Sequence, residues 1–179
     1  MVRALLLILL FILVPISSSY SAQHAIHNST NYIPATMSIK LWIKEALRLS
    51  DDIESKNKVG LQEKRERFDK IVSILIVIGN RYPERREYYR DIMLADNNSK
   101  KKALIAAVLS ALEDEQLPNI LVKLLEDKDP ANRATAIMYG EDIKDRAFID
   151  KLAHIVNEDP DIRIRRLAFY LLYSLDVNS

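Results

Sequence analysis

Cysteine is absent from the chain, and only 3 of its 179 residues are glycine. The lack of cysteine excludes a disulfide framework, a zinc–thiolate site, a lipid-modified cysteine and a thiol nucleophile. So little glycine disfavours a turn-rich β fold, whereas an apolar content of 49% suits packed helices. A charge excess is also missing, because 26 Lys and Arg residues oppose 25 Asp and Glu residues. This balance removes the electrostatic argument for a nucleic-acid partner, and we expect none.

Recognisable catalytic arrangements are missing as well. The sequence has neither a Ser/His/Asp set at a known spacing nor a glycine-rich phosphate loop. The carboxylates of 113–115 and 126–129 lie at predicted helix ends, where solvated turns and helix dipoles explain them better than an acid/base pair or a calcium loop. His154 lies beside apolar residues of a predicted helix and is interpreted as structural. We therefore predict that the protein is not an enzyme and holds no cofactor.

The first 21 residues have the pattern of a secretory signal peptide. Arg3 gives a positive start, an apolar run follows from Ala4 to Ile16, and small polar residues come next. As a helix this run spans about 20 Å, less than the ~30 Å core of a bilayer. We therefore expect cleavage after Ser21 and a secreted or periplasmic location. The alternative is an uncleaved leader that anchors the chain in a membrane, and membrane contact is expected only in that case.

Residues 22–35 are polar and are predicted to form a flexible linker. Cleavage after Ser21 would place Ala22-Gln23-His24 at the new N-terminus, with His27 nearby. An amine, two amide nitrogens and an imidazole form a nitrogen set suited to Cu(II). A linker whose histidines are placed by chance is the simpler interpretation, and we predict no metal site.

Apolar residues recur at helical spacing through the rest of the chain. The pattern predicts eight helices in about four antiparallel pairs joined by short loops. The pair in 36–80 is interpreted as a repeat or a cap, and 81–179 as a helical repeat array. The β-branched run 71–78 leaves a strand open, but the charged segment before it favours a helix. The predicted helices are 36–49, 59–78, 83–94, 100–112, 118–126, 130–139, 144–156 and 160–175.

A repeat is visible between Leu117 and Leu175. Asp129-Pro130 recurs as Asp159-Pro160, and Arg133 recurs as Arg163, at an offset of 30 residues. An Asp at a helix start can accept from free N–H groups, and a Pro fits the first turn. Each Arg can reach the acids of a neighbouring loop. Self-similarity at this period is typical of stacked helical repeats, so these residues are predicted to be structural.

The pattern Asp-Pro-x-x-Arg, which follows a Leu-rich helix with an acidic end, resembles a HEAT repeat of the short, phycobilisome-lyase kind. The resemblance is good over 117–175. It is weaker over 83–112, where Lys100 takes the Pro position and Ala103 takes the Arg position. It implies an all-α fold, a short α-solenoid, that is used mainly for protein binding. A minority of such proteins act on bilins or bind other cofactors.

These inferences favour an exported, non-catalytic protein-binding module that serves as an adaptor or scaffold. A ligand or metal carrier, or an enzyme resembling the bilin lyases, is the alternative. The leader argues against a lyase, whose chemistry belongs inside the cell. A groove lined by the second helix of each pair is the expected binding surface. The predicted partner-binding residues are cations at two helix starts and two tyrosines of the last helix: Lys101, Lys102, Arg165, Arg166, Tyr170 and Tyr173.

The last predicted helix is apolar or aromatic on more sides than one preceding pair can cover. Terminal repeats need a polar outer face to remain soluble. We therefore expect that another copy of the chain, giving a homo-oligomer, or a partner protein covers this helix, with Tyr170 and Tyr173 near the contact. The alternative is that the N-terminal helices or their linker fold over it.

Overall fold

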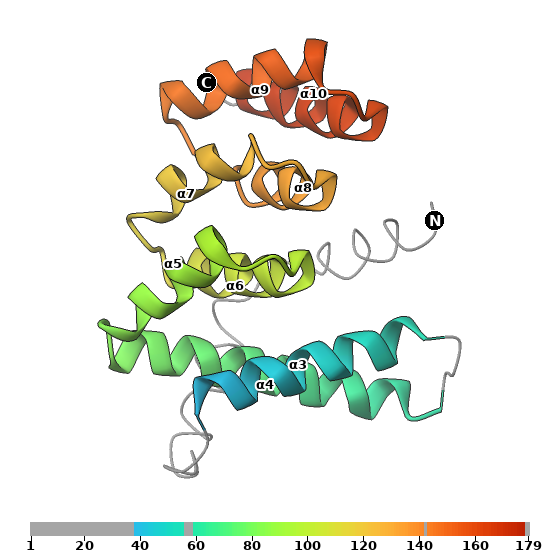
Figure 1. The fold of residues 1–179 in the computed structure, drawn as a ribbon, viewed down its shortest axis with the longest axis vertical. Helices are drawn as coiled ribbons and strands as arrows, with labels where there is room; N and C mark the ends of the chain where they lie inside the picture. Colours follow the sequence, from blue (N-terminus) through green and yellow to red (C-terminus); the bar gives the residue numbers. More distant parts are fainter. Residues whose placement is uncertain (1–37, 56–58, 142, 178–179) are drawn as a thin grey trace. The chain divides into compact units, whose positions relative to one another are not determined.

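The computed structural model describes residues 38–55, 59–141 and 143–177. Within these ranges every regular element is an α-helix, and the eight helices are labelled α3 to α10 (Figure 1). The predicted all-α fold is therefore confirmed. The predicted signal peptide (1–21) and linker (22–35), with His24 and His27, lie outside the described residues.

All eight predicted helices form, with ends that differ by a few residues. α3 continues past its predicted end at Leu49, and the apolar run 71–78 lies in α4 rather than in a strand. None of the helices in the described ranges has the length and apolarity needed to cross a membrane. The helices are α3 (Ile39–Glu54), α4 (Leu61–Arg81), α5 (Arg85–Ala95), α6 (Ser99–Ala111), α7 (Leu117–Leu124), α8 (Pro130–Met138), α9 (Arg146–Glu158) and α10 (Ile162–Val177).

The chain divides into two compact units, residues 1–78 and 79–179. In the first unit α3 and α4 run antiparallel (Figure 1), and Arg67 of α4 forms an ion pair of 2.9 Å with Glu45 of α3. Buried residues recur three or four positions apart, as expected for one apolar side of each helix. They include Ile43, Ala46 and Leu49 in α3, and Ile71, Ile74, Leu75 and Ile78 in α4.

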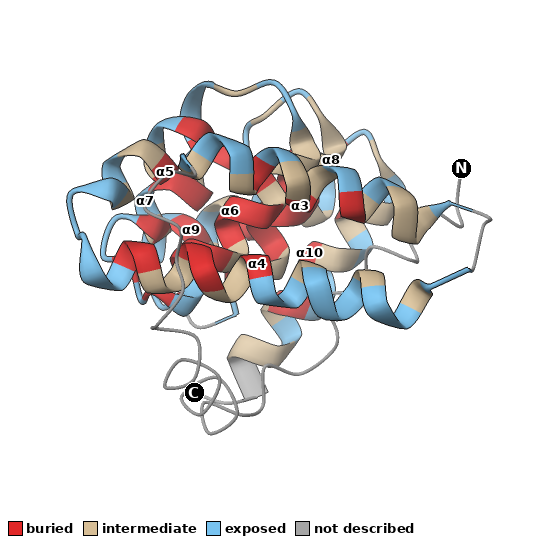
Figure 2. Ribbon diagram, turned by 90° about the horizontal axis from the view of Figure 1, so that it is seen from below, coloured by how far each residue is buried: buried red, intermediate tan, exposed pale blue. Residues whose placement is uncertain are grey.

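The second unit contains three helix pairs: α5 with α6, α7 with α8, and α9 with α10. The first helices of the pairs form one layer, α5–α7–α9, and the second helices form another, α6–α8–α10 (Figure 1). Contacts within each layer join one pair to the next. Figure 2 colours buried positions red. The largest fully buried side chains of this unit include Tyr89, Ile105, Leu109, Leu121, Phe148, Leu152 and Ile164.

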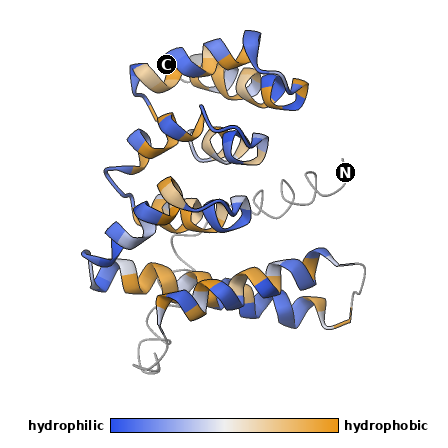
Figure 3. Ribbon diagram, in the orientation of Figure 1, coloured by the Kyte–Doolittle hydropathy of each residue, from blue (hydrophilic) through white to orange (hydrophobic). Residues whose placement is uncertain are grey.

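α6 is covered on several sides, as its composition predicts. It contacts α5, α7 and α8. After its lysines it is hydrophobic over most of its length (Figure 3), and Leu104, Ile105 and Ala106 are buried in succession. Three consecutive buried positions require neighbours on more than one side of a helix.

The turn between α8 and α9 requires a glycine. A Cβ atom on Gly140 would lie 2.6 Å from Cε1 of Phe148 and still closer to Cζ of the same ring. Phe148 is fully buried at the start of α9. Only a residue without a side chain allows this close approach of ring and backbone.

Candidate functional site

The loop before α8 is organised by two aspartates. Oδ1 of Asp127 accepts a hydrogen bond from the N–H of Asp129, and Oδ1 of Asp129 accepts from the N–H of Ala131, both at 2.9 Å. The second bond caps the helix start, where N–H groups have no partner in the helix. A loop residue and a cap residue therefore act as one local motif.

The same motif precedes α6 and α10. Asp96 accepts from the N–H of Asn98 and Asp159 accepts from the N–H of Asp161, at 2.9 and 2.8 Å. Asn98 and Asp161 then cap α6 and α10 by accepting from the N–H groups of Lys101 and Arg163. The three motifs begin at Asp96, Asp127 and Asp159, so successive offsets are 31 and 32 residues.

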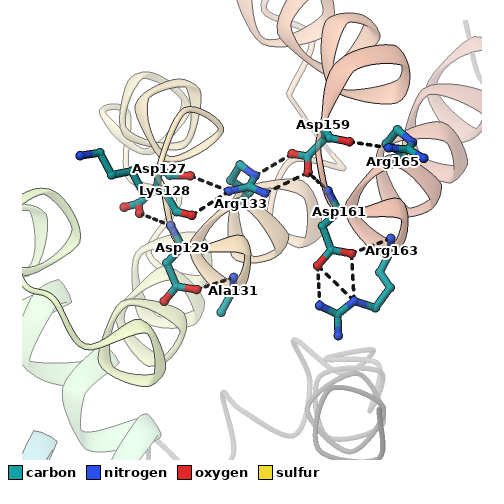
Figure 4. Close-up of polar contacts among 9 residues, drawn as sticks. All are labelled: Asp127, Lys128, Asp129, Ala131, Arg133, Asp159, Asp161, Arg163 and Arg165. Atoms are coloured by element: carbon teal, nitrogen blue, oxygen red, sulfur yellow. Dashed lines mark hydrogen bonds and ion pairs between the residues drawn. The ribbon is translucent and has the colours of Figure 1, made fainter. Parts of the chain in front are cut away.

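A cation lies six positions after the first aspartate of each motif, and the three cations form a ladder: Lys102, Arg133 and Arg165. The central one is the best bound (Figure 4). Nε and Nη2 of Arg133 donate to the two carboxylate oxygens of Asp159, at 2.6 and 2.9 Å, and both side chains are buried. Nη1 of Arg133 also donates to the carbonyls of Asp127 and Lys128, at 2.8 and 3.1 Å. The side chain thus ties its own loop to the loop of the next repeat.

Each of the other two cations forms some of the bonds that Arg133 forms. Nζ of Lys102, which is only 4% exposed, donates to Oδ2 of Asp127 at 3.1 Å, so it also reaches the next repeat. Nη1 of Arg165 donates to the carbonyl of Asp159 at 2.6 Å, as Arg133 does to the carbonyl of Asp127 (Figure 4). No carboxylate of the described residues pairs with Arg165, because no further repeat follows α10 within them.

α10 presents one apolar side to solvent, which we call the open face: Ile162, Arg166, Phe169, Tyr170 and Tyr173. Spacings of three and four place these residues on one side of a helix. Phe169, Tyr170 and Tyr173 are 54%, 67% and 64% exposed. The rings of Phe169 and Tyr170 meet edge to face with their centroids 6.1 Å apart. α10 contacts α8 and α9 through its buried residues, which include Ile164, Ala168 and Leu171.

A family model described as HEAT repeats matches residues 89–172, from α5 into α10. The matched residues form HEAT repeats. No curated protein and no solved structure matches it. The predicted HEAT repeats are confirmed, whereas the likeness to the phycobilisome-lyase kind stays a prediction.

The register of the HEAT repeats differs from the one predicted. In the structure the counterpart of Arg133 is Arg165, and Arg163 instead donates from Nε to Oδ1 of Asp161 at 2.9 Å. Pro130 opens α8, whereas Pro160 precedes α10, which begins at Ile162. In α6 the cation position is held by Lys102 rather than Ala103. The offset of 30 was wrong because matching by Asp-Pro aligned a cap residue, Asp129, with a loop residue, Asp159.

The carboxylates of the HEAT loops are adapted to these cations. Hydrogen bonds from Arg163 lower the pKa of Asp161 to about 2. The hydrogen bond from Lys101 lowers the pKa of Asp96. Burial acts to raise the pKa of Asp127, but hydrogen bonds from the Asp129 N–H and from Lys102 outweigh it, and the net pKa is lowered. These carboxylates are charged at neutral pH, and Asp127 is the one among them that pairs with a ladder cation, Lys102.

The structure separates the predicted partner-binding residues into two groups. Lys102 and Arg165 are bound within the ladder, and Nζ of Lys101 lies 2.5 Å from Oδ2 of Asp96. Arg166 is exposed and lies with Tyr170 and Tyr173 on the open face. The three cations bound within the chain are thus less available to a partner than the predicted groove assumes.

Two further residues of the open face, Ile162 and Phe169, were missed by the sequence analysis. Apolar residues are assigned to the core by default, and only their helical phase relative to Tyr173 could have placed them outside. Within the described ranges no group of three His, Cys, Asp or Glu residues could hold a metal ion. His154, interpreted from sequence as structural, is exposed on α9.

Proposed function

We propose that this HEAT repeat protein is a protein-binding module without a catalytic role, and that it acts as an adaptor or scaffold. HEAT repeats commonly mediate protein interactions, and stacked repeats offer extended surfaces for them. The charged side chains of the loops support the lack of a catalytic role, because they form ion pairs that hold one repeat to the next. Arg133 with Asp159 and Lys102 with Asp127 are examples.

The observation that carries the proposal is the open face of α10. Aromatic residues and arginine are enriched in the cores of protein interfaces, and the face combines three exposed aromatic rings with Arg166. Exposed apolar side chains that lie together, rather than singly, mark interaction sites on soluble proteins. The array does not need these rings for its own packing, because the buried side of α10 already contacts α8 and α9.

The binding role is tested with purified protein as bait in an extract of the source cells. The wild-type chain is compared with a variant in which Phe169, Tyr170 and Tyr173 are all changed to Ser. We expect proteins that the wild type retains to be lost from this variant. The matched control is Leu94→Ser, since Leu94 is an exposed apolar residue of α5. Capture that is unaffected by the triple substitution would contradict a binding role of the open face.

We further propose that the protein is exported and works outside the cytoplasm. The support is the three-part pattern of residues 1–21, with its positive start, apolar run and small polar end. Mass spectrometry of the protein from fractionated cells tests this. We expect an N-terminus at Ala22 in the exported fraction. An intact chain in the cytoplasm would contradict both export and cleavage.

A further inference from the structure

We propose that the open face of α10 pairs with the open face of a second copy of this chain, in an antiparallel arrangement about a two-fold axis near Phe169 and Tyr170. This inference names the occupant of the open face and rests on the proposed binding role of that face, with a second copy of the chain as the bound protein. Three observations support it: the register of the repeats, the residue types on the face, and the distribution of charge along α10.

The register shows that the centre of the open face, at Phe169 and Arg166, corresponds to positions that are covered in α8. The position of Phe169 is held by Ile137 in α8 and by Ala106 in α6, and both are buried. The position of Arg166 is held by Ala134 in α8, which is also buried. The counterparts of Tyr170, Met138 and Ala107, are half-buried, and those of Tyr173 are exposed. The covered part of this side in α8 thus corresponds to Phe169 and Arg166 of α10, where the side has no neighbouring helix among the described residues.

The residue types also change between α10 and the two equivalent helices before it, α6 and α8. Small or aliphatic residues hold these positions in α6 and α8, whereas α10 has Arg166, Phe169 and Tyr170. If this side of α10 faced water alone, polar residues would be expected at these positions. Large aromatic rings next to an arginine are instead the residues that contribute most to binding energy at interfaces.

The charges of α10 select the antiparallel arrangement. Arg166 is the charged residue of the open face, and Tyr173 lies seven residues further along the same face. With a two-fold axis near Phe169, Arg166 of one copy faces Tyr173 of the other, since the two lie at similar distances from the axis on opposite sides. A guanidinium over a tyrosine ring is favourable. A parallel arrangement would place Arg166 against Arg166 and is disfavoured by repulsion.

One helix face is a small interface. Stable complexes bury about 1,600 Å² in total, and a single pair of helices covers less. We therefore expect a dimer with micromolar affinity rather than an obligate one. Its formation depends on concentration, which makes it measurable by sedimentation equilibrium.

The first experiment measures the mass of the purified protein over a wide range of concentrations. We expect it to rise from that of one chain towards that of two. Phe169→Ala should weaken the dimer at least about tenfold, as loss of a central aromatic anchor does. Leu94→Ala, a change at an exposed apolar residue of α5, should leave it unchanged. A protein that is monomeric at every concentration would overturn the proposal.

The second experiment tests the orientation and uses the absence of cysteine from the chain. Arg166→Cys and Tyr173→Cys are prepared as single substitutions and oxidised, alone and as a mixture. We expect the mixture to form more cross-linked dimer than either variant alone, because each cysteine faces the other position across the axis. Self-cross-linking of each variant as efficient as that of the mixture would overturn the antiparallel arrangement.

If no dimer forms, thiol labelling of the Tyr173→Cys variant shows whether the open face is covered by the chain itself or is accessible. If the protein is monomeric and this thiol is protected, then the chain itself covers the face. If it is monomeric and the thiol reacts freely, the face is left for a different protein, such as one with an acidic helix that matches Arg166. Either result would contradict pairing between copies.

Discussion

α8 and α10 start with the same motif and hold the same place in successive repeats, yet one is enclosed and the other is open. α8 contacts α6, α7 and α10, and its residues Asn132 to Ile137 are all buried. α10 contacts α8 and α9 and exposes Phe169, Tyr170 and Tyr173. The comparison shows that the repeat motif determines where a helix starts. The number of neighbouring helices determines which of its sides are buried and which are exposed.

The cations of the two helices differ in the same way. Arg133 donates hydrogen bonds both to a carbonyl of its own loop and to the carboxylate of Asp159 in the next loop. Among the described residues, Arg165 binds its own loop alone, by donating to the carbonyl of Asp159. Equivalent arginines should therefore make unequal contributions to stability.

The largest expected effect is on Arg133. Arg133→Ala leaves the carboxylate of Asp159 buried without its cation, and loss of one partner of a buried pair costs about 3–5 kcal/mol of unfolding free energy. Arg165→Ala removes one hydrogen bond to a carbonyl and should cost about 1 kcal/mol. Urea unfolding of the two variants measures the difference. Equal losses would show that the two arginines are equivalent and would contradict the ladder as described.

The next effect concerns equivalent apolar positions. Ile137→Ala creates a cavity at a side chain that is 3% exposed, and we expect a loss of about 2–5 kcal/mol. Phe169→Ala removes a larger side chain that is 54% exposed, and we expect a change within about 0.5 kcal/mol. The measurement is made at a concentration where the chain is monomeric. A larger loss at Phe169 would mean that the monomer itself covers the open face.

A smaller effect is expected at the turn that ends α8. Gly140→Ala places a methyl group against the ring of Phe148, and overpacking of this kind costs about 1–3 kcal/mol. The equivalent position of α10 is Leu172, within a helix that continues to Val177. Thermal unfolding measures the loss, and adding Phe148→Leu should recover part of it. No recovery would indicate that backbone conformation, rather than the ring, requires glycine.

The smallest expected effect is on the pH dependence of stability, through Asp161 in the loop before α10. Since the folded pKa of Asp161 is about 2, below its ordinary value of 3.8, its stabilisation is complete above the ordinary value and is lost as the pH falls through about 2. Unfolding free energy measured between pH 5 and about 2 should decline less steeply in Asp161→Asn than in the wild type. Arg163→Ala removes the hydrogen-bond donor and should flatten the same slope. An unchanged slope in both variants would exclude this pair as a source of acid sensitivity.

Much of the fold could be predicted, because it depends on patterns within short stretches of chain. Helical spacing of apolar residues predicted all eight helices, including α4, where β-branched residues left a strand open. The composition of α6 predicted that it is covered on several sides. The role of Arg133 as a link to a neighbouring loop was also predicted and is confirmed by its bonds to Asp159.

The register and the roles of single cations could not be predicted in the same way. Asp-Pro is a visible match, but the structural motif is an aspartate followed two residues later by a capping Asn or Asp. One sequence cannot show that Lys102 replaces arginine in the ladder, because the cation is recognised by where its ammonium group lies. Lysines 101 and 102 are adjacent in sequence but bind different loops.

By itself, the sequence determined the helices, their caps and the HEAT character of the array, because backbone hydrogen bonding, capping and apolar periodicity act over a few residues. Tertiary structure alone decided which arginine is buried against a carboxylate and which apolar residues remain exposed. Both depend on how many helices surround a given side, and burial is a property of neighbours rather than of the residue. Phe169 and Ile137 hold the same repeat position, yet Ile137 is 3% exposed and Phe169 is 54% exposed.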